Sequence, residues 1–314
     1  MSDTINRARM PFVETGRVKA FLKRLDLVMS LPPEEATLLP LLGPSRCGKS
    51  AICEELERRY PAYKQGRQTI RPVVYIGLSV CITFPNFVAE ILTALGDPDP
   101  YYGGISARIQ RLRKALQAQG VKLLIIDEVQ QLIDSDTQRI AFKAADLFKT
   151  ILNFKLCHVI MSGLTHGERI LDTNSQIELR SLEPTYFTHH DWRNPDDQKD
   201  WRGFLHLLDV GLELPSRSGL GSKDTAFRIH YHAQGRLGVA VRLIEVASQI
   251  RKQYAPDRAC LDFELLGQAA EQLGYERDGK NKKVNPFQIE PPGPVDPAPM
   301  YEQIKQPRTR RTAV

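Results

Sequence analysis

The stretch GPSRCGKS, residues 43–50, constrains the fold of this chain more than any other segment. It fits the pattern G-x-x-x-x-G-K-[ST], in which the backbone N–H groups of a glycine-rich turn point inward around a phosphate. The apolar run Leu38–Leu42 comes before it, and a helix-like segment follows it. Four matched positions in this context favour a phosphate-binding loop over an ordinary strand-to-helix turn with a chance lysine.

The predicted ligand of this loop is a nucleotide with several phosphates, bound together with Mg2+. The helix behind the loop adds the positive end of its dipole, and Lys49 would reach the outer phosphates. Ser50 would ligate Mg2+ through its hydroxyl group. The residues predicted to contact the nucleotide are Gly43, Pro44, Ser45, Arg46, Cys47, Gly48, Lys49, Ser50 and Ala51.

A second apolar strand, within residues 121–132 (VKLLIIDEVQQL), ends in two acidic residues, Asp127 and Glu128. A strand without polar alternation is buried on both faces, as in a parallel sheet, and such sheets collect ligand-binding residues at the carboxyl ends of their strands. We expect Asp127 to support the Mg2+ ion and Glu128 to polarise the water that attacks the γ-phosphate.

Further strands are predicted within residues 71–80, 155–164 and 185–188, and the alternation with helices indicates a right-handed α/β sheet. Ser162 or Thr165, at the polar end of the 155–164 strand, could sense the γ-phosphate or the attacking water. From about Asp191 the pattern becomes helical, which indicates a lid.

The predicted organisation is therefore an N-terminal arm with one helix over residues 1–37 and an α/β nucleotide-binding core over residues 38–190. A helical lid over residues 191–274 and a flexible tail over residues 275–314 follow. The tail is proline-rich and basic, and it has too few apolar residues to offset the entropy of ordering.

Composition excludes several classes of protein. No apolar run approaches the roughly 20 residues that span a bilayer, and the N-terminus lacks an apolar signal region, so we expect a cytoplasmic protein without a membrane partner. Five scattered cysteines argue against a disulfide framework and against a zinc site. The net charge of +6 suits a polyanionic partner without proving one.

The acidic strand end, the strand between it and the phosphate loop, and the helical lid together resemble the AAA+ class of ATPases. More narrowly, the chain resembles the TniB and TnsC family of transposition ATPases, which is related to the Mu B target-selection protein. The resemblance runs over about residues 12–274. The segments that carry it are GPSRCGKS, RPVVYI, FVAEILTALGDP, LLIIDEVQQL, HVIMSGL, SQIELRS, FLHLLDVGLELP and GRLGVAVRLIEVAS.

This resemblance implies ATP-bound rings or filaments on double-stranded DNA that select or mark an insertion site and recruit the transposase, with ATP hydrolysis driving disassembly. The target selector would be a TniQ-like protein, a guide-RNA complex or neither. By position, Lys49 and Ser50 bind nucleotide and Mg2+, Asp127 supports the metal, and Glu128 activates water. Arg180 matches an arginine that would reach the γ-phosphate of a neighbouring subunit; the alternative is a surface salt bridge.

Two positions depart from the family pattern. Where many AAA+ lids place an arginine three residues after a glycine, this chain has Gly238 after Gly235, and Arg236 or Arg242 could substitute. Family members often have a threonine after the glycine that ends the strand predicted within residues 155–164, whereas this chain has Leu164, which leaves Ser162 as a candidate sensor.

The basic residues between the strand predicted within residues 71–80 and the acidic strand are the candidates for DNA contact; a solvated helix face is the alternative for them. Two other functions stay open: a P-loop metabolic kinase or nucleotidase, and a scaffold that holds nucleotide without hydrolysing it. The DNA candidates are Arg108, Arg111, Arg113 and Lys114.

Overall fold

The computed structural model describes residues 10–79, 83–133, 138–173, 175–274, 284–289 and 293–294. These residues form two compact units. The α/β unit contains the described parts of residues 25–45 and 52–186. The helical unit contains the described parts of residues 1–24 and 187–298, and it also takes in residues 46–51.

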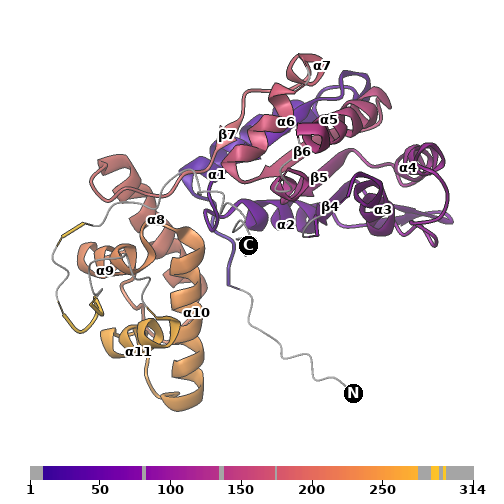
Figure 1. The fold of residues 1–314 in the computed structure, drawn as a ribbon. Helices are drawn as coiled ribbons and strands as arrows, with labels where there is room; N and C mark the ends of the chain where they lie inside the picture. The colour runs from indigo at the N-terminus through magenta and orange to yellow at the C-terminus, as the bar shows by residue number, and fades with distance from the viewer. Residues whose placement is uncertain are drawn as a thin grey trace, which may run out of the picture. The chain divides into compact units, whose positions relative to one another are not determined.

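A five-stranded parallel sheet forms the centre of the α/β unit (Figure 1), in the order β4-β5-β6-β1-β7. Every residue of β1, β5 and β6 is buried, as expected for strands that are covered on both faces. The strands are β1 (Leu38–Leu42), β4 (Val73–Gly77), β5 (Leu123–Asp127), β6 (His158–Gly163) and β7 (Thr185–Tyr186). The predicted α/β sheet is confirmed.

Helices and one small hairpin complete this unit, and the rings of Phe87 and Phe148 lie 5.9 Å apart in its core. Strands β2 (Tyr63–Gln65) and β3 (Gln68–Ile70) form the exposed antiparallel hairpin. The helices are α1 (Gly16–Met29), α2 (Lys49–Arg59), α3 (Phe84–Ala94), α4 (Ile105–Ala118), α5 (Gln138–Asn153), α6 (Arg169–Asp172) and α7 (Ser175–Glu178), with 3-10 turns η1 (Pro33–Glu35), η2 (Val129–Leu132) and η3 (Thr165–Glu168). Helices α1 and α2 each include residues of both units.

The helical unit is built from α8 (Pro195–Gly211), α9 (Lys223–Ala233), α10 (Leu237–Tyr254) and α11 (Phe263–Leu273) (Figure 1). Side chains of Asn194, Ser222 and Asp262 cap α8, α9 and α11 by accepting backbone N–H groups of the first turn. Its core is filled by Trp201 together with Leu205 and Leu208 of α8, Leu243 of α10, and Leu265 and Leu266 of α11. The helical pattern predicted after residue 190 is therefore present.

Residues 284–289, which fall in the segment expected to be a flexible tail, instead pack against this unit. Phe287 is only 7% exposed and belongs to the core, where its ring lies 6.0 Å from that of Phe263. The Asn285 amide donates to the carbonyl oxygen of Gly267 at 3.0 Å. The other calls on the tail concern residues 275–283, 290–292 and 295–314, which lie outside the described residues.

None of the helices that the structure describes combines the length and the apolar character needed to cross a bilayer.

Candidate functional site

Strands β5, β6 and β1 lie side by side and end at the same edge of the sheet. Asp127 is the last residue of β5, and Leu42 of β1 pairs with Gly163 of β6. The N–H of Gly43, the first residue of the phosphate loop, donates to the carbonyl oxygen of Gly163 at 3.2 Å. The parallel sheet therefore places the start of the loop and the acidic strand end on one edge.

The loop between β1 and α2 has the backbone of a tight anion-binding turn. Arg46 has a φ of 63° and Gly48 a φ of 100°, and only glycine adopts the latter without strain. Helix α2 begins at Lys49 and has 11 residues, so its first N–H groups and its dipole favour an anion at this end. Backbone and sequence therefore both fit a bound phosphate group.

Lys49 is held within the loop rather than extended into solvent. Its side chain is 7% exposed, and its Nζ lies 3.6 Å from Sγ of Cys47. Burial raises the pKa of the Cys47 thiol, although the Lys49 ammonium opposes this shift. The thiol therefore stays neutral at physiological pH and does not form an ion pair with the Lys49 ammonium group.

Asp127 is fully buried and is held by two neutral donors. The hydroxyl of Tyr75, on the adjacent strand β4, donates to Oδ2 at 3.2 Å, and the N–H of Glu128 donates to Oδ1 at 2.9 Å. Burial, and secondly the charge of Asp127, raise the pKa of Tyr75, so its hydroxyl remains a donor. Each carboxylate oxygen keeps a lone pair, which suits a hard cation such as Mg2+.

Glu128 follows in a left-handed conformation, with φ 61° and ψ 36°, and its side chain is partly exposed. For a residue other than glycine this backbone costs about 1–2 kcal/mol, and such strain is found repeatedly at functional sites. Nε2 of Gln130 donates to Oε2 of the Glu128 carboxylate, and the N–H of Leu164 donates to Oε1 of Gln130 at 3.0 Å.

The two candidate sensor residues lie at the same strand edge. Ser162 is fully buried in β6, and its Oγ has no hydrogen-bond partner among the described residues. Thr165 is buried at the start of η3, just beyond β6. A buried hydroxyl without a partner is costly, so Ser162 is suited to a contact that forms only with a ligand or water.

The start of α10 carries the glycine and the arginines that were compared from the sequence with the lid arginine of AAA+ proteins. Gly238 lies in the first turn of α10, and its N–H donates to the carbonyl oxygen of Arg46 at 2.8 Å. A Cβ atom at Gly238 would lie 3.2 Å from atoms of Arg46, so glycine permits this approach. Arg242 pairs with Glu245 at 2.6 Å, and Arg236 is the N-cap residue of α10.

Arg180 lies just beyond α7, and its side chain is exposed. Its Nη1 donates to Oδ1 of Asn153 at 2.6 Å, which is a hydrogen bond to an amide rather than the salt bridge considered from the sequence. The carbonyl oxygen of Arg180 accepts the N–H of Leu38 at 2.9 Å. The backbone at this position is therefore anchored to β1 while the guanidinium group stays at the surface.

The four basic candidates for DNA contact on α4 fall into two pairs. Arg108 and Arg111 donate to backbone carbonyl oxygens of the preceding loop, and Arg111 also pairs with Asp97 at 2.9 Å. Arg113 and Lys114 are exposed, and the Arg113 guanidinium lies 6.0 Å from the ring centre of Phe154. Arg108 and Arg111 thus organise their own loop, and Arg113 and Lys114 face solvent.

Sequence reasoning missed two polar residues of this edge, Tyr75 and Gln130. Tyr75 is the one residue with a polar side chain in β4, and its hydroxyl could have been considered as a partner for the neighbouring strand. Gln130 follows the acidic pair by two residues, but no local pattern shows that its amide turns back to Glu128.

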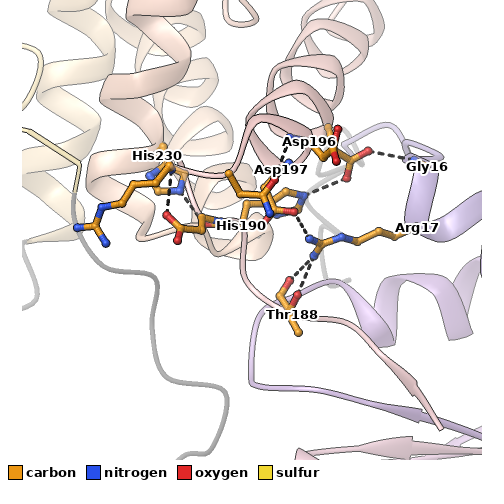
Figure 2. A network of polar contacts seen from close by, with 11 residues as sticks. Gly16, Arg17, Thr188, His190, Asp196, Asp197 and His230 are labelled. Atoms are coloured by element: carbon orange, nitrogen blue, oxygen red, sulfur yellow. Dashed lines mark hydrogen bonds and ion pairs between the residues drawn. The ribbon is translucent and has the colours of Figure 1, made fainter.

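A separate polar network lies within the helical unit (Figure 2). Arg17 donates to the carbonyl oxygen and the hydroxyl of Thr188 at 2.8 and 3.1 Å, and it pairs with Asp197. Nε2 of His190 lies 3.0 Å from Asp200, and Nε2 of His230 lies 2.7 Å from the carbonyl oxygen of His190. This network joins the start of α1 to the segment before α8 and to helices α8 and α9.

The parallel sheet, the loop after β1 and the acidic end of β5 together have the arrangement of the P-loop AAA+ fold. Solved structures with this fold include the Aeropyrum pernix Orc1 protein in complex with DNA, with 16% identity and a TM-score of 0.57 over 84% of this chain and 67% of that one. The ADP form of Orc2 from the same organism has 13% identity and a TM-score of 0.57, with 86% and 71% of the chains covered. Cdc6p of Pyrobaculum aerophilum has 18% identity and a TM-score of 0.58, with 84% and 69% covered.

The chain belongs to the TniB family. The family model described as "Bacterial TniB protein" matches residues 4–193, which is more than half of the 314 residues. The resemblance to this family that the sequence motifs indicated is thereby confirmed. The comparison with curated proteins gives no match.

Proposed function

We propose that this protein is an ATPase that assembles on double-stranded DNA and regulates transposition. In this proposal the ATP-bound oligomer, a ring or a filament, marks the target site and recruits the transposase, and hydrolysis releases it. A TniQ-like protein or a guide-RNA complex would direct it to the target, and it would act in the cytoplasm. The observation that supports this most directly is the phosphate loop and the Asp127–Glu128 pair on one sheet edge of a TniB-family chain.

Each polar group of the sheet edge has a role in this proposal. The loop N–H groups and Lys49 bind the phosphates of ATP. Ser50 and Asp127 supply the oxygen ligands of Mg2+, which when bound offsets charge on the phosphates. Glu128 accepts a proton from the water whose oxygen attacks the γ-phosphorus, while the bond from that phosphorus to the bridging oxygen of ADP breaks. Ser162 donates its free hydroxyl toward the γ-phosphate or the water.

Arg180 is proposed to act on the nucleotide of a neighbouring subunit. Within the described part of the chain, its exposed guanidinium donates to the neutral amide of Asn153, so it can be released without leaving a buried charge behind. An arginine supplied by the next subunit would offset the charge that develops on the γ-phosphate. The active site would then be complete only in the oligomer.

DNA contact in this proposal uses phosphates and is independent of sequence. Arg113 and Lys114 are the better candidates, because Arg108 and Arg111 hold the loop before α4. Alanine substitution of Arg113 or Lys114 should weaken binding to all duplexes alike. For each phosphate contact that is lost, the slope of log K against log salt concentration should decrease in magnitude by about one.

The experiment that tests the proposal is steady-state ATP hydrolysis with and without duplex DNA. We expect hydrolysis that DNA stimulates; a small-molecule kinase would ignore DNA, and a non-hydrolysing scaffold would bind ATP without turnover. Lys49→Ala should lose ATP-dependent assembly, because the loop loses its phosphate cation. Glu128→Gln should keep nucleotide affinity but lower hydrolysis about 100-fold or more, because an amide cannot accept the proton. Equal loss of nucleotide binding in both variants would show that Glu128 is structural.

Mixed oligomers test the proposed role of Arg180. Arg180→Ala should retain nucleotide affinity in the monomer yet lose DNA-stimulated hydrolysis and ordered assembly. Oligomers that mix Arg180→Ala and Lys49→Ala subunits should regain some hydrolysis. They contain interfaces where the intact loop of an Arg180→Ala subunit meets the intact arginine of a Lys49→Ala subunit. An inactive mixture, despite the formation of mixed assemblies, would contradict a role across the subunit boundary.

A further inference from the structure

The buried amide of Gln130 connects the carboxylate of Glu128 to the end of β6. Gln130 lies in η2 and is 3% exposed. Its Oε1 accepts the N–H of Leu164 at 3.0 Å, and its Nε2 donates to Oε2 of Glu128. One side chain thus bonds at the same time to the candidate proton acceptor and to the backbone beyond the neighbouring strand.

The chemistry of the two partners determines which way this amide faces. The N–H of Leu164 can only donate, so it requires the oxygen of the amide. The nitrogen must then point to Glu128, whose ionised carboxylate can only accept. Rotation of the amide by half a turn would break both hydrogen bonds, so the amide holds one orientation.

Close packing around Gly163 keeps the amide at this place. A Cβ atom on Gly163 would lie 2.6 Å from Oε1 of Gln130 and 2.7 Å from Cγ2 of Val129. Only a residue without a side chain therefore lets η2 approach β6 this closely. Because Gly163 also accepts the N–H of Gly43, the chain of contacts runs from the phosphate loop through residues 163 and 164 to Gln130 and Glu128.

We propose that Gln130 is the positioning residue for Glu128, which holds the carboxylate in the orientation that accepts the proton of the attacking water. The inference rests on the proposed ATPase function. A glutamate side chain has three rotatable bonds, and an amide donor holds its carboxylate without neutralising the charge that proton transfer requires. The contact with Leu164 lets a shift of the phosphate loop reach Glu128 through one peptide group.

The test compares two substitutions of Gln130 that differ in one hydrogen bond. Gln130→Met fills a similar volume but has neither bond. Gln130→Glu keeps an acceptor for the N–H of Leu164 but places a carboxylate against Glu128. We expect kcat for ATP hydrolysis on duplex DNA to fall about 10- to 100-fold in Gln130→Met and further in Gln130→Glu, with KM for ATP and the affinity for a fluorescent ATP analogue unchanged.

Two double variants separate positioning from a general effect on the fold. In a Glu128→Gln background, Gln130→Met should not lower hydrolysis further, because the group that it positions is already absent. Glu128→Gln combined with Gln130→Glu exchanges amide and carboxylate, and it should recover the melting temperature lost in Gln130→Glu without recovering hydrolysis. That pair of results is not expected of a residue that only fills space.

Wild-type kcat in Gln130→Met, or equal additional losses in both backgrounds, would overturn the inference and leave the ATPase proposal standing. Absence of ATP hydrolysis by the wild-type protein on any DNA would overturn both. A parallel rise in KM and fall in kcat for both Gln130 variants would show that the amide shapes the nucleotide pocket instead.

Discussion

The two polar clusters of this molecule hold their carboxylates by different donors. At the sheet edge, Asp127 and Glu128 accept hydrogen bonds from a tyrosine hydroxyl, a backbone N–H and an amide, all of them neutral. In the helical unit, Asp197 and Asp200 accept from an arginine and a histidine (Figure 2). Neutral donors position a carboxylate and leave its charge available for a cation or proton, whereas the guanidinium group of Arg17 offsets the charge of Asp197 and joins the start of α1 to α8.

Substitution at Gly235 should be the most damaging test of the helical cluster. Gly235 has a φ of 74°, and a Cβ atom there would lie 2.1 Å from the carbonyl oxygen of His190. The left-handed backbone and the overlap together should lower the free energy of unfolding of Gly235→Ala by about 3–5 kcal/mol. Chemical denaturation measures the change. Gly219→Ala is the matched control, because Gly219 has a φ of 69° but nothing within 4 Å of the added atom; equal losses in both variants would exclude the contact with His190 as the cause.

His230, which is buried in the same cluster, predicts a pH dependence of stability. Burial lowers the pKa of His230 from 6.5 to about 4, so the unfolded chain binds a proton in this range that the folded chain does not bind. The contribution of His230 to the free energy of unfolding is therefore fully present above about pH 6.5. It is lost as the pH decreases toward 4, by up to about 3 kcal/mol. His230→Gln keeps a donor for the His190 carbonyl oxygen and cannot titrate, so its stability should fall less over this range. The same slope in both proteins would contradict the assignment.

At the sheet edge, Gly163→Ala should affect hydrolysis more than stability. The added methyl group would displace Gln130 and Val129, which costs about 1–2 kcal/mol of unfolding free energy. Hydrolysis should decrease about tenfold or more, because Glu128 loses its positioned donor. Gly104→Ala, in the same unit and with nothing within 4 Å, is the control. A stability loss without a change in hydrolysis would separate Gly163 from the catalytic group.

The smallest effect is expected from the C-terminal end. Deletion of residues 288–314 removes, among the described contacts, only those of Gln288 and Ile289 and should change the unfolding free energy by about 0.5 kcal/mol or less. Deletion from residue 284 also removes Phe287 and Asn285 and should cost about 2–4 kcal/mol. Thermal melting of both truncated proteins measures the difference, and a large loss in the shorter deletion would show that residues beyond 289 contribute to the fold.

The sequence predicted those features that depend on neighbours along the chain. The strand before the phosphate loop and the strand ending at Asp127 have continuous apolar residues, and both lie where they were expected. The helices after residue 190 likewise follow from their 3.6-residue period. These elements can be predicted without information about which distant residues they contact.

Features that depend on contacts between distant segments were not predicted. The spacing of Arg108 and Arg111 indicates a basic helix face, but it does not show that the loop before α4 folds back to accept their hydrogen bonds. Likewise, Phe287 is one apolar residue in a proline-rich segment, and only the position of α11 provides a surface that covers it. The role of Gln130 could not be predicted from the sequence, because it depends on how closely η2 approaches the end of β6.

The hydrogen bond between Gln130 and residue 164 has a consequence for how this protein can evolve. Leucine at position 164 contributes its backbone N–H and not its side chain. Substitutions there can accumulate without affecting the contact, provided that the backbone keeps its course. Proline is the exception, since it lacks the N–H. Variation among relatives should therefore be permissive at position 164 and restricted at positions 130 and 163, and a protein engineer could alter the polarity of residue 164 while keeping Glu128 in place.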